Sequence, residues 1–292
     1  MDSSLGRVAK AEQTRDVVPA AGVQPLTGGM RAMLYIASGL VFIVGIQLFI
    51  GSEYTDRYFA WTVKPSLTAA FLGGAYWASF SLEWLAARQA AWARARVAVP
   101  AVLTFTTLTL VATLLHLDKF HLNSPNPETA LAAWAWIAVY AGVPGAMSLL
   151  LLRQLRAPGG DPPRRLPLPR LVQGGLAVTG LALIGLGVAL FVAPTALLGG
   201  WPWALTPLTA RAVAAWLLGL GIAIAHSAWE ADWQRVQPGM MGLAVFGALQ
   251  IVSLLRYPDA VRWNSPAAWL YVVGIVVALV MGGYGLWAAR RA

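Results

Sequence analysis

Long apolar stretches recur along the chain from Arg31 onward. Eight of them can be marked, at residues 31–51, 66–88, 97–116, 129–152, 171–193, 208–229, 238–256 and 267–288. Each has about 20 residues, the length that a helix rising 1.5 Å per residue needs to cross roughly 30 Å of hydrocarbon. The alternating ten-residue segments of a membrane β-barrel are not seen, and backbone within lipid must pair its own polar groups. The pattern predicts an all-α integral membrane protein with eight transmembrane helices.

The chain also matches itself when it is shifted by 141 or 142 positions. Residues of uncommon type coincide at these offsets: Trp61 with Trp203, Pro65 with Pro207, Trp92 with Trp233, Arg94 with Arg235, Asp118 with Asp259, and Asn123-Ser124-Pro125 with Asn264-Ser265-Pro266. Each copy holds four apolar stretches, an even number, so both copies enter and leave the bilayer on the same side. The sequence therefore predicts two parallel four-helix repeats about an axis along the membrane normal.

A linker rich in proline and arginine separates the two copies. The segment Arg153 to Arg170 holds five prolines and five arginines, which prevents helix continuation and is typical of a semi-rigid linker. Residues 1–29 carry charges without the apolar run of a secretory signal peptide. The expected organisation is a disordered cytoplasmic tail at 1–29, repeat A at 30–153, the linker at 154–170 and repeat B at 171–292.

The basic residues are distributed unevenly between the two ends of the expected helices. With the N-terminus inside, the tail, three loops and the C-terminus hold 15 of the 21 lysines and arginines. Positive residues are retained on the cytoplasmic side, so both termini are expected to be cytoplasmic. The same distribution explains the formal charge of +9 without a nucleic-acid partner, because no soluble basic face is formed. Abundant arginine and alanine favour a bacterial inner membrane as the location of this multipass protein.

Composition narrows the chemistry further. The chain is 58% apolar and 11% charged and has no cysteine. These values exclude an ordinary soluble domain, disulfides, thiolate metal sites and cysteine nucleophiles. A haem held by two histidines is also disfavoured, because His116 and His226 are expected at opposite ends of their helices. No cofactor is indicated.

The repeated polar residues on the expected outer side have two interpretations. These residues precede the last helix of each copy: Asp118, Asp259, Asn123 and Asn264. One interpretation is a ligand site with symmetric positions in the two copies. The other is a structural role, in which their side chains cap backbone amides near the helix start. The structural interpretation is favoured, because Ser265-Pro266 is a good helix start and Asn126-Pro127 offers another. Arg211, in the first turn of a helix, either extends outward, meets an acid such as Asp259, or forms an anion site.

Three further candidates are ionisable residues in the expected helices or directly after them: Glu83, His226 and Glu230. Glu83 is about 17 residues into its helix, where a carboxylate is costly and often functional, although a side chain this close to the inner headgroups can also extend to the interface. His226 and Glu230 lie four residues apart on one helical face, where they pair or relay protons, or are simply interfacial.

A weak metal site is the last chemical candidate. His116, Asp118 and His121 supply three metal-capable side chains near one another. The second copy has Tyr257, Asp259 and Arg262 instead, so such a site would be confined to one half.

Small residues spaced by four in two helices predict close packing of those helices. They are Ala70, Gly74 and Ala78 in one helix and Ala215, Gly219 and Ala223 in another.

Three functions remain open after this reading. The first is binding or translocation of a small or lipidic solute between the two repeats, for which the parallel architecture is typical. The second is a non-catalytic scaffold or accessory subunit of a membrane complex, held in the lipid bilayer with a membrane-protein partner. The third is a membrane enzyme at the outer surface with Asp118 or Asp259 as acid or base. An enzyme is the least favoured, because no nucleophile or cofactor fingerprint is present.

Overall fold

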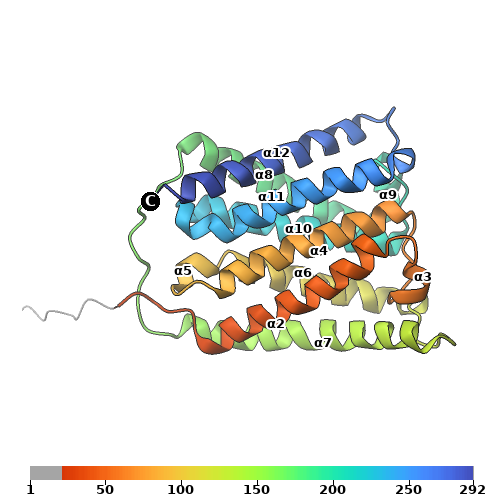
Figure 1. Cartoon of the computed structure of the whole chain (residues 1–292), viewed down its shortest axis with the longest axis horizontal. Helices are drawn as coiled ribbons and strands as arrows, with labels where there is room; N and C mark the ends of the chain where they lie inside the picture. The colour runs from red at the N-terminus through yellow and green to blue at the C-terminus, as the bar shows by residue number, and fades with distance from the viewer. Residues whose placement is uncertain (1–21, 292) are drawn as a thin grey trace, which may run out of the picture.

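The computed structural model describes residues 22–291, which form a bundle of long helices joined by short turns (Figure 1). The long helices are α2 (Gly28–Gly45), extended by a π-helical turn at Ile46–Ile50, α4 (Ser66–Ala87), α6 (Ala98–Leu115), α7 (Pro127–Leu155), α8 (Arg170–Val192), α10 (Pro207–Glu230), α11 (Trp233–Arg256) and α12 (Pro266–Ala289). Short helices lie in the connections: α3 (Thr55–Tyr58), α5 (Trp92–Ala95) and α9 (Pro194–Leu197). The described part of the chain is therefore all-α, as expected.

Seven of these helices are long and apolar enough to cross a membrane, and α4 is not among them. The seven are α2 with its π-helical turn, α6, α7, α8, α10, α11 and α12. The chain is thus a multipass membrane protein embedded in a lipid bilayer. The helices lie within a few residues of the expected stretches. The largest shift is in α11, which begins at Trp233 because the Asp232 side chain accepts hydrogen bonds from the amides of Gln234 and Arg235.

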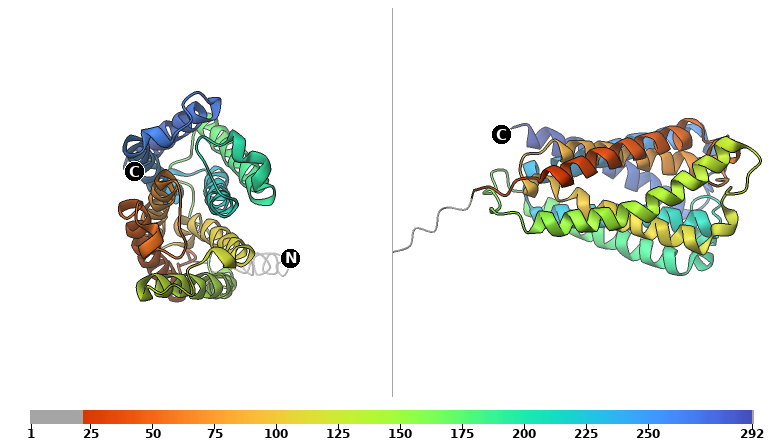
Figure 2. Two further views of the ribbon diagram at one scale, coloured as in Figure 1. Left: turned by 90° about the vertical axis from the view of Figure 1, so that its right-hand side faces the viewer. Right: turned by 90° about the horizontal axis from the view of Figure 1, so that it is seen from below.

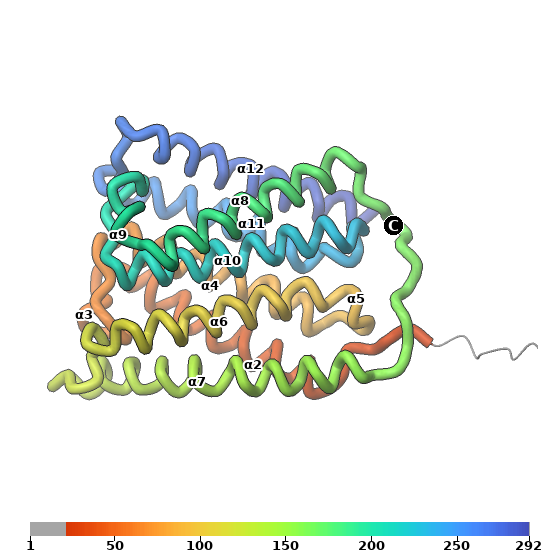
Figure 3. Tube along the Cα trace, turned by 180° about the vertical axis from the view of Figure 1, so that it is seen from behind, coloured from red at the N-terminus to blue at the C-terminus, as the bar shows by residue number. Residues whose placement is uncertain are grey.

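The first described residues are packed against the bundle. Val23 pairs with Gly160 and Pro25 with Ala91 in isolated β-bridges, and Leu26 is buried. Of the tail expected at 1–29, residues 1–21 lie outside the described residues, and helix α2 already begins at Gly28. The start of α2, the short helix α5 and the C-terminal end of α12 all lie at one end of the bundle (Figures 1 and 3).

Helices α4 and α10 form the buried centre, and each packs closely on one neighbour that precedes it in the chain. Helix α4 packs on α2, and helix α10 packs on α8. A Cβ atom on Gly73 would lie 2.3 Å from the Phe49 amide nitrogen, and one on Gly180 would lie 2.6 Å from that of Ala225. Backbones this close require glycine, because helices in lipid associate by packing rather than by hydrophobicity.

Each central helix also packs on a helix that is distant in the sequence: α4 on α11, and α10 on α6 (Figure 2). The small-residue positions make these contacts. A Cβ on Gly74 would lie 3.2 Å from Leu249 Cβ on α11, and one on Gly219 would lie 3.2 Å from the Ala101 carbonyl oxygen on α6. The close packing expected of α4 and α10 is therefore present, directed at α11 and α6.

The pairs α11–α12 and α6–α7 differ in how closely they pack. Hypothetical Cβ atoms on Gly247 and Gly282 would lie 2.6 Å and 2.4 Å from backbone nitrogens of the facing helix. Helix α6 has no glycine. A Cβ atom added to Gly142 or Gly145 of α7 would have no atom of another described element within 4 Å. Helices α11 and α12 are thus in backbone contact, whereas α6 and α7 are held apart by side chains.

A glycine substitution tests this difference. Gly282→Val should lower the unfolding temperature in detergent, because its Cβ would meet the Ala244 amide nitrogen, and overpacking typically costs about 1–3 kcal/mol. The neighbouring Gly283 has open space at its Cβ position, so Gly283→Val is the matched control. Thermal unfolding followed by size-exclusion chromatography should separate the two variants. Equal unfolding temperatures would contradict the close α11–α12 contact.

Candidate functional site

A cavity of about 260 Å³ lies among α2, α4, α6 and α7. Most of its wall is aliphatic or aromatic, and its polar lining comes from Gln47, Tyr76, Glu83, Thr106 and Tyr140. The space is well above the roughly 10–15 Å³ of this measure that one water needs, so it can hold a small molecule. A mostly apolar space with a few polar groups is the usual composition of a small-molecule site.

Glu83 is the charged residue of this wall. Its side chain is fully buried, and Ser79 Oγ donates a hydrogen bond of 2.6 Å to its Oε1. Its Oε2 has no hydrogen-bond partner among residues 22–291, and no ion pair to Glu83 is found there. The side chain does not extend to the interface, which was the alternative interpretation from the sequence. A buried carboxyl oxygen without a partner is expensive, so its presence beside a cavity needs an explanation.

Two tyrosines join α4 to α7 within the cavity wall. The hydroxyl oxygens of Tyr76 and Tyr140 lie 2.6 Å apart, and both side chains are buried. The ring of Tyr140 lies 4.3 Å from that of Trp136 and 6.1 Å from that of Phe105, measured between centroids. Aromatic pairs at these distances add to the area that they bury. The rings form a packed wall between α6 and α7, where the helix backbones do not meet.

The cavity reaches the surface between α2 and α7. Ile43 of α2 and Ala135 of α7 both line it, and both are exposed, Ile43 to 56%. These two helices run side by side on one flank of the bundle (Figure 2, right). Both of these helices are long and apolar enough to cross a membrane.

The space between the two halves of the chain is much smaller. It lies among α4, α6, α10 and α11, measures about 70 Å³ and is lined almost entirely by apolar side chains, with Ser79 and Ser227 as the exceptions. The solute site expected between the repeats therefore has little room there, and the larger cavity lies within the first four long helices.

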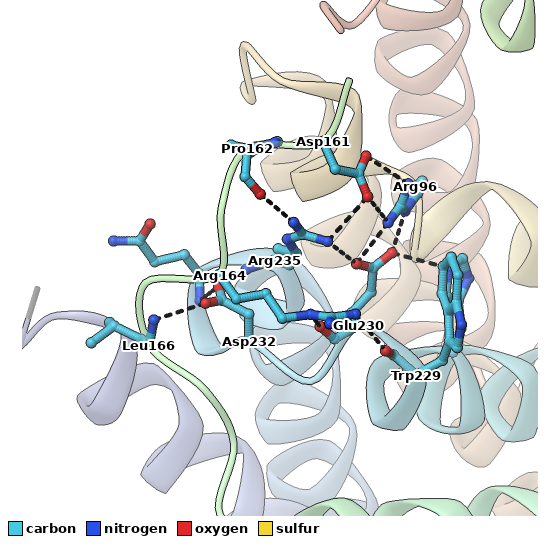
Figure 4. A network of polar contacts seen from close by, with 11 residues as sticks. Arg96, Asp161, Pro162, Arg164, Leu166, Trp229, Glu230, Asp232 and Arg235 are labelled. Carbon is cyan, nitrogen blue, oxygen red and sulfur yellow. Dashed lines mark hydrogen bonds and ion pairs between the residues drawn. The ribbon is translucent and has the colours of Figure 1, made fainter. Parts of the chain in front are cut away.

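A second polar group, the Glu230 cluster, lies at the end of the bundle that holds α5 (Figure 4). It consists of Arg96, Asp161, Glu230 and Arg235. The fully buried Glu230 carboxylate accepts hydrogen bonds from Nε and Nη2 of Arg96 and, at 3.0 Å, from Nη1 of Arg235. Asp161 of the linker accepts hydrogen bonds from the same two arginines. Two cations thus face two anions, and the cluster is formally neutral.

The surrounding contacts show that the Glu230 cluster fastens the linker. Arg235 donates to the Pro162 carbonyl, Arg164 donates to the Glu230 carbonyl at 2.8 Å, and the Leu166 amide donates to Asp232 at 2.8 Å. These bonds join residues of the linker to the ends of α10 and α11. Burial opposes the charge of Arg96, but hydrogen bonds to Glu230 and Asp161 outweigh it and raise the Arg96 pKa.

His226 also lies beside the Glu230 carboxylate, as expected for two residues four positions apart on one helix. Its Nε2 lies 3.3 Å from Glu230 Oε1. Since two arginines already bind Glu230, the arrangement favours a fixed structural ion pair over a proton relay.

The four paired outer residues are all exposed: Asp118, Asp259, Asn123 and Asn264. Asp118 Oδ2 lies 2.9 Å from the Lys119 ammonium, which lowers the Asp118 pKa. The helix starts named from the sequence are confirmed, because the side chains of Ser265 and Asn126 accept hydrogen bonds from the Ala267 and Glu128 amides.

Arg211 reaches different partners from those expected. Its Nε donates to the Phe191 carbonyl at the end of α8 at 3.2 Å, and its Nη1 donates to His116 Nε2 at 2.8 Å. A cation at a helix C-terminus is favourable, so this arginine caps α8 rather than meeting Asp259. Burial, together with the Arg211 charge, lowers the His116 pKa and keeps the imidazole neutral, as the hydrogen bond requires.

The structure does not assemble the weak metal candidate of His116, Asp118 and His121. His121 Nδ1 bonds to the Phe59 carbonyl and its Nε2 to Thr62, both at 3.1 Å, while His116 bonds to Arg211. Within residues 22–291 no group of three histidine, aspartate or glutamate side chains could hold a metal ion.

Several residues of these two sites were not found from the sequence. The tyrosine pair could have been suspected from hydroxyls inside apolar stretches, at Tyr76 and Tyr140. Arg96 and Asp161 carry no local signal, because each is one of many charged residues in the loops, and the match of Arg235 with Arg94 did not indicate a partner. Their role depends on partners such as Glu230, which lies 134 positions from Arg96.

Comparisons with known proteins supply no relative. No family model matches this chain, and neither a curated protein nor a solved structure matches it. Its function must therefore be argued from its own side chains and packing.

Removing one arginine from the Glu230 cluster should destabilise the protein. Arg235→Ala leaves a buried carboxylate with one charged partner fewer, and such losses typically cost about 3–5 kcal/mol. The control is Arg165→Ala in the same linker, where the side chain is exposed. The measurement is the unfolding temperature of the purified variants in one detergent. If both variants unfold at the same temperature as the parent, the Glu230 cluster does not stabilise the protein.

Proposed function

We propose that this multipass membrane protein binds a small lipophilic molecule in the cavity among α2, α4, α6 and α7. The observation that carries the proposal is the unpartnered Oε2 of Glu83, buried beside a space of about 260 Å³ with apolar walls. A ligand that hydrogen-bonds to this oxygen and fills the space would satisfy both features. Because the opening lies between α2 and α7, the ligand would enter from the hydrocarbon.

The proposal includes eight membrane spans, with α4 as a span shielded by its neighbours. Helix α4 has 22 residues, about 33 Å at 1.5 Å per residue, which is long enough to cross the hydrocarbon. Sixteen of these residues are buried, against α2 and α11 among others. A helix covered by protein does not need the apolar composition of one that faces lipid, which explains why α4 is less apolar than the other seven.

The proposal also treats the two halves as copies of one four-helix unit, and equivalent hydrogen bonds support this. The Leu26 amide donates to the Ala90 carbonyl, and the Leu168 amide donates to the Ala231 carbonyl. The same offsets of 141 and 142 relate the bond from His121 to Ala60 and the bond from Arg262 to Pro202. The packing of α4 on α11 and of α10 on α6 is likewise what a two-fold relation between the copies would give.

In this scheme the copies differ at the positions that make the cavity. At the 141 offset Glu83, Tyr76 and Tyr140 correspond to Ile224, Leu217 and Met281, all apolar. The close contact through Gly247 and Gly282 closes the equivalent space in the second half. The first half would bind the ligand, and the second would provide the packed support for it.

Single-cysteine labelling tests whether α4 spans the bilayer. The chain has no cysteine, so Lys64→Cys and Arg88→Cys, at exposed sites before and after α4, each introduce one thiol. We expect a membrane-impermeant maleimide to label Lys64→Cys in intact cells and Arg88→Cys only after permeabilisation. The cysteine-free parent measures the background. Equal labelling of both sites in intact cells would remove α4 as a span.

Ligand binding is tested with decanol, a neutral single-chain probe. We expect radiolabelled decanol to bind saturably to the protein in nanodiscs, above its partition into protein-free nanodiscs. Val139→Trp should abolish this binding, because Val139 lines the cavity. Ala138→Trp is the matched control and should keep it, because Ala138 is exposed and outside the lining. Decanol retention that is identical in Val139→Trp and the parent would refute the proposed site.

A further inference from the structure

We infer that the ligand of this cavity is a single-chain amine whose ammonium group pairs with Glu83, an inference that rests on the proposed function and names its ligand class. The cavity wall, the depth of Glu83 and the missing counter-charge lead to this class independently of one another.

Glu83 lacks a charged partner in the described structure. No lysine, arginine or histidine forms an ion pair with Glu83 within residues 22–291, although the carboxyl group is fully buried. This contrasts with Glu230, which is equally buried and is bound by two arginines. A buried carboxylate without a cation is costly, whereas one paired and hydrogen-bonded is tolerated. An ammonium group would supply both the charge and the donor that Oε2 lacks.

The cavity extends lengthwise along α4. Along α4 the lining runs from Tyr76 to Glu83, seven residues or about 10 Å. It continues past Tyr76 to Gln47 and Phe59, which belong to the opposite end of the bundle from α5. The lining therefore extends lengthwise along the bundle, and an unbranched chain with one polar end matches that length.

The polar and the aromatic parts of the cavity wall lie in different places. Glu83 lies four residues before the end of α4 at Ala87, so it is the polar group of the wall nearest the end of the bundle that holds α5. The aromatic side chains Phe59, Phe105 and Trp136 line the remainder. An amphiphile would therefore place its ammonium at Glu83 and its chain along the aromatic wall, and it could enter sideways between α2 and α7.

Neutral and anionic amphiphiles fit less well. An anion would lie beside the carboxylate without a compensating cation, which is unfavourable in a low dielectric. An alcohol would satisfy Oε2 by hydrogen bonding but would supply no charge. The difference between amine and alcohol is therefore the measurable signature of this ligand class.

The experiment compares decylamine, decanol and decanoate, which share one chain and differ in the head group. Binding is measured to the full-length protein in nanodiscs of uncharged lipid, with protein-free nanodiscs and Val139→Trp as blanks. The variant Glu83→Gln keeps the size and a hydrogen-bond acceptor at this position but removes the carboxylate. We expect decylamine to bind the parent at least tenfold more tightly than decanol, and decanoate to show no saturable binding.

In Glu83→Gln we expect the preference for decylamine over decanol to disappear while decanol affinity stays within about threefold of the parent, because the amide oxygen still accepts a hydrogen bond. Equal affinities of the parent for amine and alcohol, or an amine preference that survives in Glu83→Gln, would overturn the inference and leave the cavity as a site for neutral lipophiles. Absence of saturable binding by all three probes would instead overturn the proposed function. Loss of decanol binding in a Glu83→Gln protein with unchanged unfolding temperature would also contradict the amine assignment.

Discussion

The distance between helix backbones is the constraint on which the rest of this structure depends. In lipid, apolar side chains gain little from meeting each other, so helices associate where their backbones approach closely. Glycine permits that approach between α2 and α4 at Gly73, between α8 and α10 at Gly180, and between α11 and α12 at Gly247 and Gly282. Helix α6 has no glycine. Helices α6 and α7, which follow one another in the chain and are held apart by side chains, both border the large cavity.

Two buried glutamates show two solutions to the same electrostatic problem. Glu230 is paired with two arginines, and the resulting cluster joins the linker to the ends of two long helices. Glu83 has only the Ser79 hydroxyl as a partner in the described structure and faces a cavity. The cost of burying a carboxylate is similar in both places. A carboxylate whose oxygens all have partners therefore indicates a structural role, whereas a carboxyl group with one unpartnered oxygen indicates a binding site. This contrast supports the proposed ligand-binding function.

Residues that match at offsets of 141 and 142 lie mainly at helix starts and turns, and some hydrogen bonds there have counterparts at the same offsets. At the 141 offset Ile224 stands opposite Glu83, so this carboxyl group has no counterpart in the second half. If the halves are copies, binding chemistry acquired by one of them would appear as a mismatch. An unmatched polar residue inside a helix is then a better candidate than a matched one in a loop.

The sequence by itself determined where the long helices lie, their all-α class, and caps such as Asn126 and Ser265, because apolar run length and capping act between residues close in the chain. It also singled out Glu83, Arg211 and the His226–Glu230 pair as chemically unusual. Only the tertiary structure decided that Arg211 caps α8, that Glu230 binds Arg96, and that Glu83 faces a cavity. Each of these depends on which helices come together, and that choice follows from backbone contacts between segments far apart in the sequence.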